Sequence, residues 1–304
     1  MSSLYDIINI SPLIDLLHNE IYDLKKISLS ILRLDKIHPV ISGNKLFKLH
    51  YFLDEAMSSS HKTIITFGGA WSNHLAATAY ACEKKGLKCI GFVRGEKPAL
   101  LSHTLKFCIQ HGMELEFISR DLYQKKETTE FYNTLSREYG EHTLMPEGGF
   151  STIGAKGAER ITDFFDSKNY THICCAVGTA TTFAGLINGA GVNTEVIGFG
   201  VLKGLEDISQ SLKRLHVDDK KKYVFNGDYH FGGYAKKNKE LITFMNTFYQ
   251  NNKIPLDFVY TGKMMFGVMD LIKNSYFQPG SNIICIHTGG LQGNQSLPKG
   301  MLNF

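Results

Sequence analysis

The sequence predicts an α/β protein with two lobes, each built on an open, twisted and mainly parallel sheet flanked by helices. Short apolar runs alternate with stretches whose apolar residues recur at helical spacing, which is typical of parallel strands joined by crossover helices. Four of these runs lead into turns rich in glycine and small polar residues. The chain has 304 residues, which is enough for one large or two modest domains.

The first part of the chain predicts one lobe. After a loosely patterned start, apolar residues at helical spacing indicate a helix from Leu46 to Met57. The apolar runs "TIITFGG", "KCIGFV", "ELEFIS" and "TLMPEGG" are expected to be strands. Helices are expected between them over residues 73–85, 100–111 and 127–139.

The same alternation continues after Gly149 and predicts the second lobe. Helices are expected over 154–165 and 182–188, before the strands "THICCAVG" and "TEVIGFGVL". Further helices are expected over 208–215, 237–249 and 264–274, the last before the strand "NIICIHTGG". With a seam near residues 146–154, the predicted division is a large domain of residues 1–46 and 149–304 and a small α/β domain of residues 47–148.

Composition excludes several classes of protein. The net charge of +4 is small for this length and the lysines are scattered along the chain, which argues against a nucleic-acid partner. No apolar stretch is long enough to span a membrane, and the N-terminus lacks the basic and apolar regions of a signal peptide. The six cysteines form no CxxC pair, so we expect free thiols in a reducing cytoplasm and no metal site.

The stretch "VGTATTFAG" is a candidate anion site. Gly178 permits a tight turn after a strand, and Thr179, Ala180, Thr181 and Thr182 open a helix whose N–H groups and hydroxyls suit a phosphate. It lacks the lysine of a P-loop and does not match GxGxxG, so it fits no standard nucleotide site. The alternative interpretation is a strand-to-helix turn capped by threonines.

The stretch "GGAWSNH" has the same architecture. Ser72 and Asn73 are expected to open a helix and to face the cleft at the ends of the strands. The alternative is that both residues are ordinary helix caps and that His74 is structural.

Two lysines in "HPVISGNKLFKL" open a helix where the helix dipole disfavours a positive charge. The dipole, and partial burial, would lower the pKa of Lys45 and favour the neutral amine that Schiff-base chemistry requires. Lys48 lies one turn further along. The alternative is that Lys45 is a solvated surface lysine.

A Schiff-base lysine and a phosphate site together suggest pyridoxal phosphate (PLP). Six stretches, "HPVISGNKLFKL", "TFGGAWSNHLAATA", "PEGGFSTIGAKG", "VGTATTFAGL", "VYTGKMMFGVMDLI" and "HTGG", resemble the 1-aminocyclopropane-1-carboxylate (ACC) deaminase/D-cysteine desulfhydrase family over residues 30–292. This resemblance implies the tryptophan synthase β-like fold, with PLP in the cleft between the lobes, the large domain binding the cofactor, and commonly a homodimer.

The resemblance also implies roles for individual residues. Lys45 would bind the cofactor covalently, Lys48 and the stretch from Gly178 to Thr182 would bind its phosphate, and Asn73 would bind its 3′-hydroxyl. Lys45 or Ser72 would remove the substrate's Cα proton. Further residues expected to contact the substrate are Asn44, His74 and Tyr260.

Two positions bear on the substrate. Where the deaminases carry glutamate and leucine, this chain has Thr261 and Thr288, both expected beside the cofactor. Without the glutamate the pyridine ring is a weaker electron sink, which suits β-elimination of D-cysteine to pyruvate, hydrogen sulfide and ammonia. The alternatives are an ACC deaminase that yields 2-oxobutyrate and ammonia, or a PLP-binding protein without turnover. The bulky Phe150, expected at the substrate, departs from the family pattern.

Overall fold

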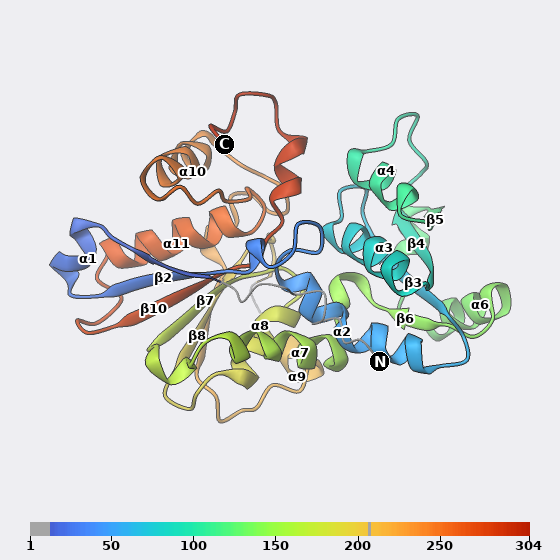
Figure 1. Cartoon of the computed structure of the whole chain (residues 1–304), viewed down its shortest axis with the longest axis horizontal. Coiled ribbons are helices and arrows are strands. Elements are labelled where there is room, and N and C mark those ends of the chain that lie inside the picture. The colour runs from blue at the N-terminus through green and yellow to red at the C-terminus, as the bar shows by residue number, and fades with distance from the viewer. Residues whose placement is uncertain (1–12, 206–207) are drawn as a thin grey trace.

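The computed structural model describes residues 13–205 and 208–304, and it contains two sheets flanked by helices (Figure 1). The larger sheet has the strand order β1-β2-β10-β7-β8-β9, and the smaller has the order β5-β4-β3-β6. The predicted fold class, α/β with two mainly parallel sheets, is confirmed.

The larger sheet is parallel except at one edge. Its strands are β1 (Ile14–Leu17), β2 (Ser28–Arg33), β7 (His172–Val177), β8 (Glu195–Gly200), β9 (Tyr223–Asn226) and β10 (Asn282–His287). Only β1 and β2 pair antiparallel among the described strands. Helices cover both faces, which explains why β7, β8 and β10 are almost continuously apolar.

The N-terminal part contributes two strands of this sheet, β1 and β2, and a short helix between them, α1 (Glu20–Lys25), none of which the apolar pattern predicts. In β2 the pattern is interrupted by Ser30 and Arg33, which are nevertheless buried. Arg33 forms ion pairs with Asp15 (2.8 Å) and Asp35 (2.6 Å). The arginine is compatible with a buried strand because its charge is paired.

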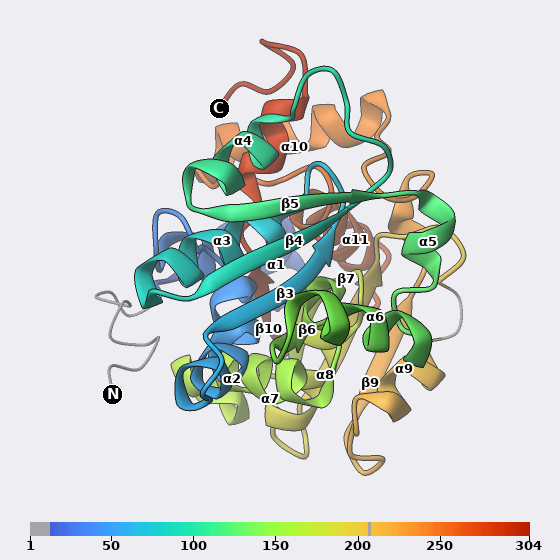
Figure 2. The same cartoon turned by 90° about the vertical axis from the view of Figure 1, so that its right-hand side faces the viewer.

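The smaller sheet is parallel throughout. Its strands are β3 (Thr63–Gly68), β4 (Lys88–Arg94), β5 (Met113–Ile118) and β6 (Thr143–Met145), and Figure 2 looks onto it. The helices α3 (Asn73–Lys85) and α4 (His103–Gln110) pack on one face. The other face is covered by α5 (Arg120–Gln124) and α6 (Thr129–Tyr139), where Tyr123 and Phe131 pack on Phe67.

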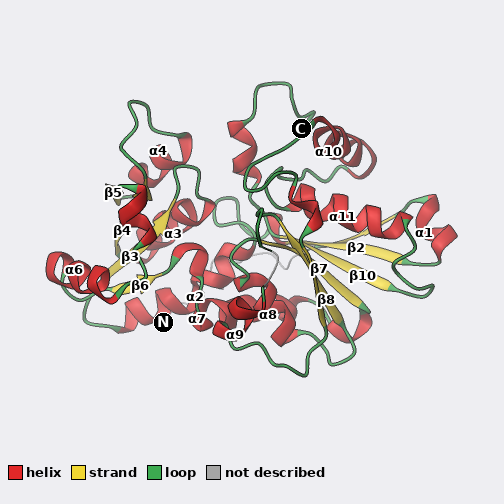
Figure 3. Ribbon diagram, turned by 180° about the vertical axis from the view of Figure 1, so that it is seen from behind, coloured by secondary structure: helices red, strands yellow, loops and turns green. Residues whose placement is uncertain are grey.

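Helices of the larger sheet fall into two layers (Figures 1 and 3). One layer contains α10 (Lys239–Asn252) and α11 (Thr261–Lys273). The other contains α2 (Asn44–Ser58), α7 (Thr152–Glu159), α8 (Thr181–Gly189) and α9 (Ser209–Arg214). A methyl group on Gly157 of α7 would lie 2.1 Å from the Phe47 carbonyl oxygen, so glycine allows α2 to pack tightly on α7.

Residues 63–145 form the smaller sheet and its helices, and the larger sheet takes strands from both sides of this insertion. The exact division at residues 47 and 148 stays a prediction. In the part of the chain that the structure describes, no helix combines the length and apolar character needed to cross a membrane.

Candidate active site

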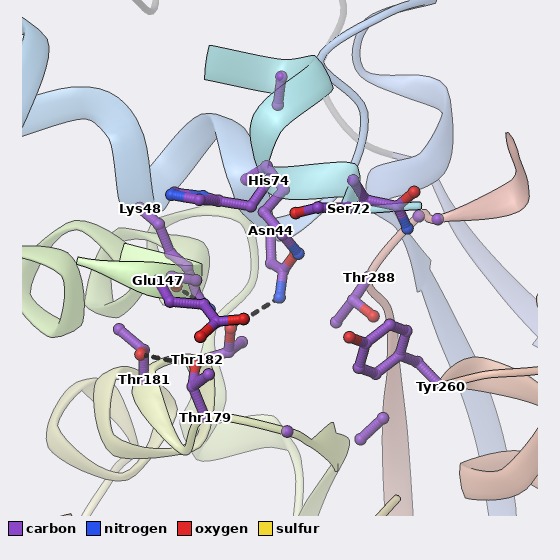
Figure 4. A pocket seen from close by; sticks show the side chains of 18 of the residues that line it. Asn44, Lys48, Ser72, His74, Glu147, Thr179, Thr181, Thr182, Tyr260 and Thr288 are labelled. Carbon is purple, nitrogen blue, oxygen red and sulfur yellow. Dashed lines mark hydrogen bonds between the residues drawn. The ribbon is translucent and has the colours of Figure 1, made fainter. Parts of the chain in front are cut away.

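A cavity of about 410 Å³ lies where strands of both sheets end. Its lining comes from the turns after β3, β4, β6, β7, β8 and β10 and from the first turns of α2, α3, α8 and α11. This is the edge at which parallel sheets bind ligands. The sequence-predicted site residues that line it are Asn44, Lys45, Lys48, Ser72, Asn73, His74, Gly178, Thr179, Ala180, Thr181, Thr182, Tyr260 and Thr288 (Figure 4).

A glycine fixes the start of the helix that carries both lysines. Gly43 has φ 74° and ψ −154°, and a methyl group on it would lie 1.9 Å from the Thr288 carbonyl oxygen. The same oxygen accepts a hydrogen bond from the Asn44 N–H (3.3 Å). Only glycine combines this backbone conformation with this close approach. Gly43 therefore seats the start of α2 against the turn after β10.

Lys45 begins a chain of polar contacts across the cavity. Its Nζ donates to Asn44 Oδ1 (2.8 Å), and Asn44 Nδ2 donates to Thr182 Oγ1 (2.7 Å). Burial lowers the pKa of Lys45 to about 8, and the nearby charge of Asp257 opposes this shift. Most of the amine is still charged at neutral pH, but its neutral form, which bond formation with an aldehyde requires, is far more populated than in an ordinary lysine.

Lys48 is almost fully buried on the same face of α2. Its Nζ donates to the Gly148 carbonyl oxygen (2.8 Å), and within the described residues it forms no ion pair with a carboxylate. Burial, and then the charge of Lys45, hold its pKa well below the usual value. A buried cation of this kind is stabilised when an anion binds beside it.

The turn between β7 and α8 forms the opposite side of this anion site (Figure 4). Ala180 adopts the left-handed conformation (φ 63°) and contributes no side-chain cap to α8. The hydroxyls of Thr179 and Thr181 lie 3.1 Å apart. Uncapped N–H groups at a helix start, with hydroxyls and Lys48 nearby, match the chemistry of a phosphate.

The start of α3 supplies two unsatisfied polar atoms. Ser72 Oγ caps the helix by accepting from the Leu75 N–H (3.3 Å), so the predicted capping role is present as well. Asn73 Oδ1 and His74 Nδ1 are buried without a hydrogen-bond partner. His74 Nε2 lies 2.9 Å from Thr66 Oγ1, and burial lowers the pKa of His74 to about 3. Unpartnered buried atoms at a cavity wall indicate a ligand that completes them.

A buried aspartate that the sequence analysis missed organises the start of α11. Asp257 has no exposed surface, and its carboxylate accepts from the N–H groups of Val259, Tyr260 and Thr261 at 2.8–2.9 Å. It also accepts from the Thr261 hydroxyl (2.7 Å). The signal in the sequence was an aspartate shortly before a helix that begins with threonine.

Two predicted site residues are not brought to the cavity. Thr261 is fully buried and does not line it, because its hydroxyl faces Asp257. Phe150 packs against the apolar core, and the Arg214 guanidinium lies 4.9 Å from its ring centre.

Further lining residues that the sequence analysis missed include Arg94, Glu147, Tyr234 and Gln292. Arg94 ends β4, and Glu147 lies in the "PEGG" turn, both places where ligands were expected.

The lining residues fit PLP. Lys45 supplies an amine of lowered pKa for the aldehyde, and Lys48 with the α8 turn supplies an anion site for the phosphate. The free Asn73 Oδ1 supplies an acceptor for a ring hydroxyl.

Similar proteins agree with this assignment. A protein of Thermotoga maritima named "Putative 1-aminocyclopropane-1-carboxylate deaminase" is 32% identical over 271 residues, covering 83% of this chain and 85% of the relative. The D-cysteine desulfhydrase of Serratia proteamaculans is 27% identical, covering 92% of this chain and 89% of the relative. The crystal structure of an ACC deaminase homologue superposes with a TM-score of 0.80 at 27% identity, covering 97% and 96% of the two chains.

The predicted family resemblance and the predicted cofactor are confirmed. The family model of pyridoxal-phosphate-dependent enzymes matches residues 11–289, most of the chain. This chain therefore belongs to the pyridoxal-phosphate-dependent enzyme family, and PLP is its cofactor.

Proposed function

We propose that this enzyme is a lyase that eliminates the β-substituent of a small D-amino acid, converting D-cysteine to pyruvate, hydrogen sulfide and ammonia. The observation that carries the proposal is the nearly acid-free cavity wall. Among the described lining residues the one carboxylate is Glu147, which pairs with Lys126 (3.5 Å). Thr288 lines the cavity as a neutral residue, and Thr261 turns its hydroxyl away toward Asp257.

A pyridine nitrogen without a carboxylate partner suits elimination better than ring opening. When bound, PLP supplies an electron sink for the charge that develops at the substrate's Cα, and this sink is strongest with a protonated pyridine nitrogen. No carboxylate takes the place of the deaminases' glutamate at Thr261. A reaction in which a good leaving group departs from Cβ depends less on the sink than opening a cyclopropane does.

The protein's own groups have separable roles in this proposal. Lys45, whose neutral form is accessible near pH 8, removes the Cα proton, and the Ser72 hydroxyl is the alternative base at the same wall. Burial, and then Tyr234, raise the pKa of Tyr260 well above its usual value, so its hydroxyl keeps its proton. Tyr260 can then donate a hydrogen bond to the substrate carboxylate or to the leaving group.

A second candidate function is ACC deamination. It is favoured by relatives such as the Thermotoga maritima protein, which is named for that activity. The relatives include both activities, so similarity alone does not choose between them. A third candidate, a PLP-binding protein without turnover, predicts no product from any amino acid tested.

The test is to assay the purified holoenzyme with D-cysteine, L-cysteine and ACC, and to measure pyruvate, sulfide and 2-oxobutyrate. We expect pyruvate and sulfide in equal amounts from D-cysteine. Thr288→Leu introduces the residue of the deaminases at a cavity position and should lower D-cysteine turnover, whereas Phe150→Leu, outside the cavity, should not. Release of 2-oxobutyrate from ACC, with no pyruvate from D-cysteine, would overturn the proposal.

A further inference from the structure

A fully buried lysine lies just behind the cavity wall, outside the residues that have been given a role. Lys263, in the first turn of α11, has no exposed surface. Its Nζ donates to the carbonyl oxygens of Gly233 (2.7 Å), His230 (2.8 Å) and Val201 (3.4 Å). The three protons of the ammonium thus meet three backbone carbonyls.

The three backbone carbonyl oxygens form a cation site, and the ammonium group of Lys263 occupies it. Within the described residues no carboxylate forms an ion pair with Lys263, although the charge of Asp257 raises its pKa. Burial lowers the pKa of Lys263 to about 8, so most of the group stays charged at neutral pH. An ammonium is rarely buried this completely unless it is fully hydrogen-bonded.

The three carbonyls belong to two segments that lead directly to the cavity. Val201 precedes Leu202, and Gly233 precedes Tyr234, and both Leu202 and Tyr234 line the cavity. Gly233 has φ 116°, a conformation that favours glycine, so its carbonyl is presented by a specialised turn. Lys263 therefore ties both segments to α11 at the residues next to the wall.

The same helix start carries Tyr260, which meets Tyr234 across this wall. Tyr234 contributes to the raised pKa of Tyr260, and the two ring centres lie 6.4 Å apart. Asp257 fixes the Tyr260 backbone through its N–H (2.8 Å). Asp257 thus holds one tyrosine of the pair, and Lys263 holds the segment that carries the other.

We propose that Lys263 is a positioning residue whose ammonium occupies the three-carbonyl site as a tethered monovalent cation and holds Tyr234 against Tyr260 at the substrate side of the cavity. This role of Lys263 goes beyond the proposed function. It rests on the cavity being the catalytic site, but it is the same whichever amino acid is the substrate.

The test uses the holoenzyme and two variants of the same position. Lys263→Ala removes the ammonium with three carbons of its stem, a fragment that n-propylammonium replaces, and Lys263→Met keeps the stem without the charge. We expect KM for the amino-acid substrate to rise roughly tenfold in both, the size of effect that loss of charged hydrogen bonds produces. n-Propylammonium should lower KM of Lys263→Ala several-fold but leave Lys263→Met unchanged.

Controls separate charge from packing and from reaction with the cofactor. 1-Propanol has nearly the same shape as n-propylammonium without the charge, and it should not restore Lys263→Ala. Wild type with n-propylammonium measures any reaction of the amine with PLP. Tyr234→Phe removes the hydroxyl but leaves the three-carbonyl site filled, so it should raise KM and show no response to n-propylammonium.

A second readout does not depend on activity. Hydrogen–deuterium exchange of residues 227–235 should be faster in both Lys263 variants and should return toward wild type when n-propylammonium is added to Lys263→Ala. Equal recovery with 1-propanol would show a packing role and overturn the proposal, as would unchanged exchange in both variants. If D-cysteine gives no product with any form of the enzyme, the proposed function fails, whereas the exchange result still decides the role of Lys263.

Discussion

Asp257→Asn separates structural support from electrostatic support at the active site. The aspartate accepts four hydrogen bonds, two at each carboxylate oxygen, and it has no exposed surface. In asparagine one oxygen becomes an NH₂ group, which places a donor opposite the Thr261 N–H. A buried N–H without an acceptor costs about 1–3 kcal/mol, and a lost hydrogen bond to a charged group about 1.5–3 kcal/mol. We expect the free energy of unfolding to fall by about 3–5 kcal/mol.

The same substitution should also change the acid–base behaviour of Lys45. The charge of Asp257 raises the pKa of Lys45 against the effect of burial, which sets the value at about 8. Removing the charge therefore lowers this pKa further, and the amine becomes neutral at a lower pH. The pKa is measured as the pH dependence of acetylation of Lys45 in cofactor-free protein, read by mass spectrometry of the peptide that contains it.

Thr261→Val is the matched control. It removes a hydroxyl that donates to Asp257 and also accepts from the Asp257 N–H (2.8 Å), so it too should destabilise the protein. It keeps the negative charge, so the pKa of Lys45 should not change. Urea denaturation of the three proteins gives the stabilities. If Asp257→Asn leaves the pKa of Lys45 unchanged, or if both variants lower it equally, this account of the site's electrostatics is wrong.

Three further predictions concern the glycine, the phosphate site and Phe150. Gly43→Ala should lower the free energy of unfolding by about 2–4 kcal/mol and reduce bound PLP, because the new methyl group meets the Thr288 carbonyl at a backbone conformation that favours glycine. Gly86→Ala is the control, since Gly86 has φ 64° and a methyl group there would meet no atom within 4 Å. Equal losses of stability in the two variants would refute the close-approach argument. Lys48→Met should weaken PLP binding roughly tenfold to a hundredfold, measured by equilibrium dialysis, and unchanged affinity would remove Lys48 from the phosphate site. Phe150→Leu should leave the ratio of kcat/KM for two D-amino acids of different size unchanged, since a changed ratio would mean that residue 150 reaches the substrate.

Local patterns predicted the elements that carry the cavity. The helix starts at Asn73 and near Asn44, and the turns after β7 and β10, follow from apolar runs that end in glycine and small polar residues. Strands β1 and β2 were not predicted because Asp15 interrupts the apolar residues of β1, and Ser30 and Arg33 those of β2. The ion pairs of Arg33 with Asp15 and Asp35 are identifiable only in three dimensions. Pattern reading assigns a charged residue to the surface unless its partners are known.

The site was predicted less completely than the fold for a related reason. Residues that enter the cavity directly after a strand could be predicted from position alone, as Gly178 and Thr179 after β7 show. Side-chain direction could not, and Thr261 turns toward a buried carboxylate four residues earlier in the chain. Phe150 turns to the apolar core, where the guanidinium of Arg214 covers its ring. Which way a side chain at a turn points depends on partners that have no fixed spacing in the sequence.

The attachment of PLP to Lys45 tests the central claim most directly. The holoenzyme is reduced with borohydride, digested, and analysed by mass spectrometry, with Lys45→Ala and Lys48→Ala treated in parallel. Because Lys45 is the cavity lysine that bonds Asn44 and lies 6.0 Å from the centre of the Tyr260 ring, we predict one pyridoxyl group on Lys45 in the wild type. Lys48→Ala should keep this modification at lower cofactor content, and Lys45→Ala should lose it. A pyridoxyl group on Lys48 or on any other lysine of the wild type would contradict the account.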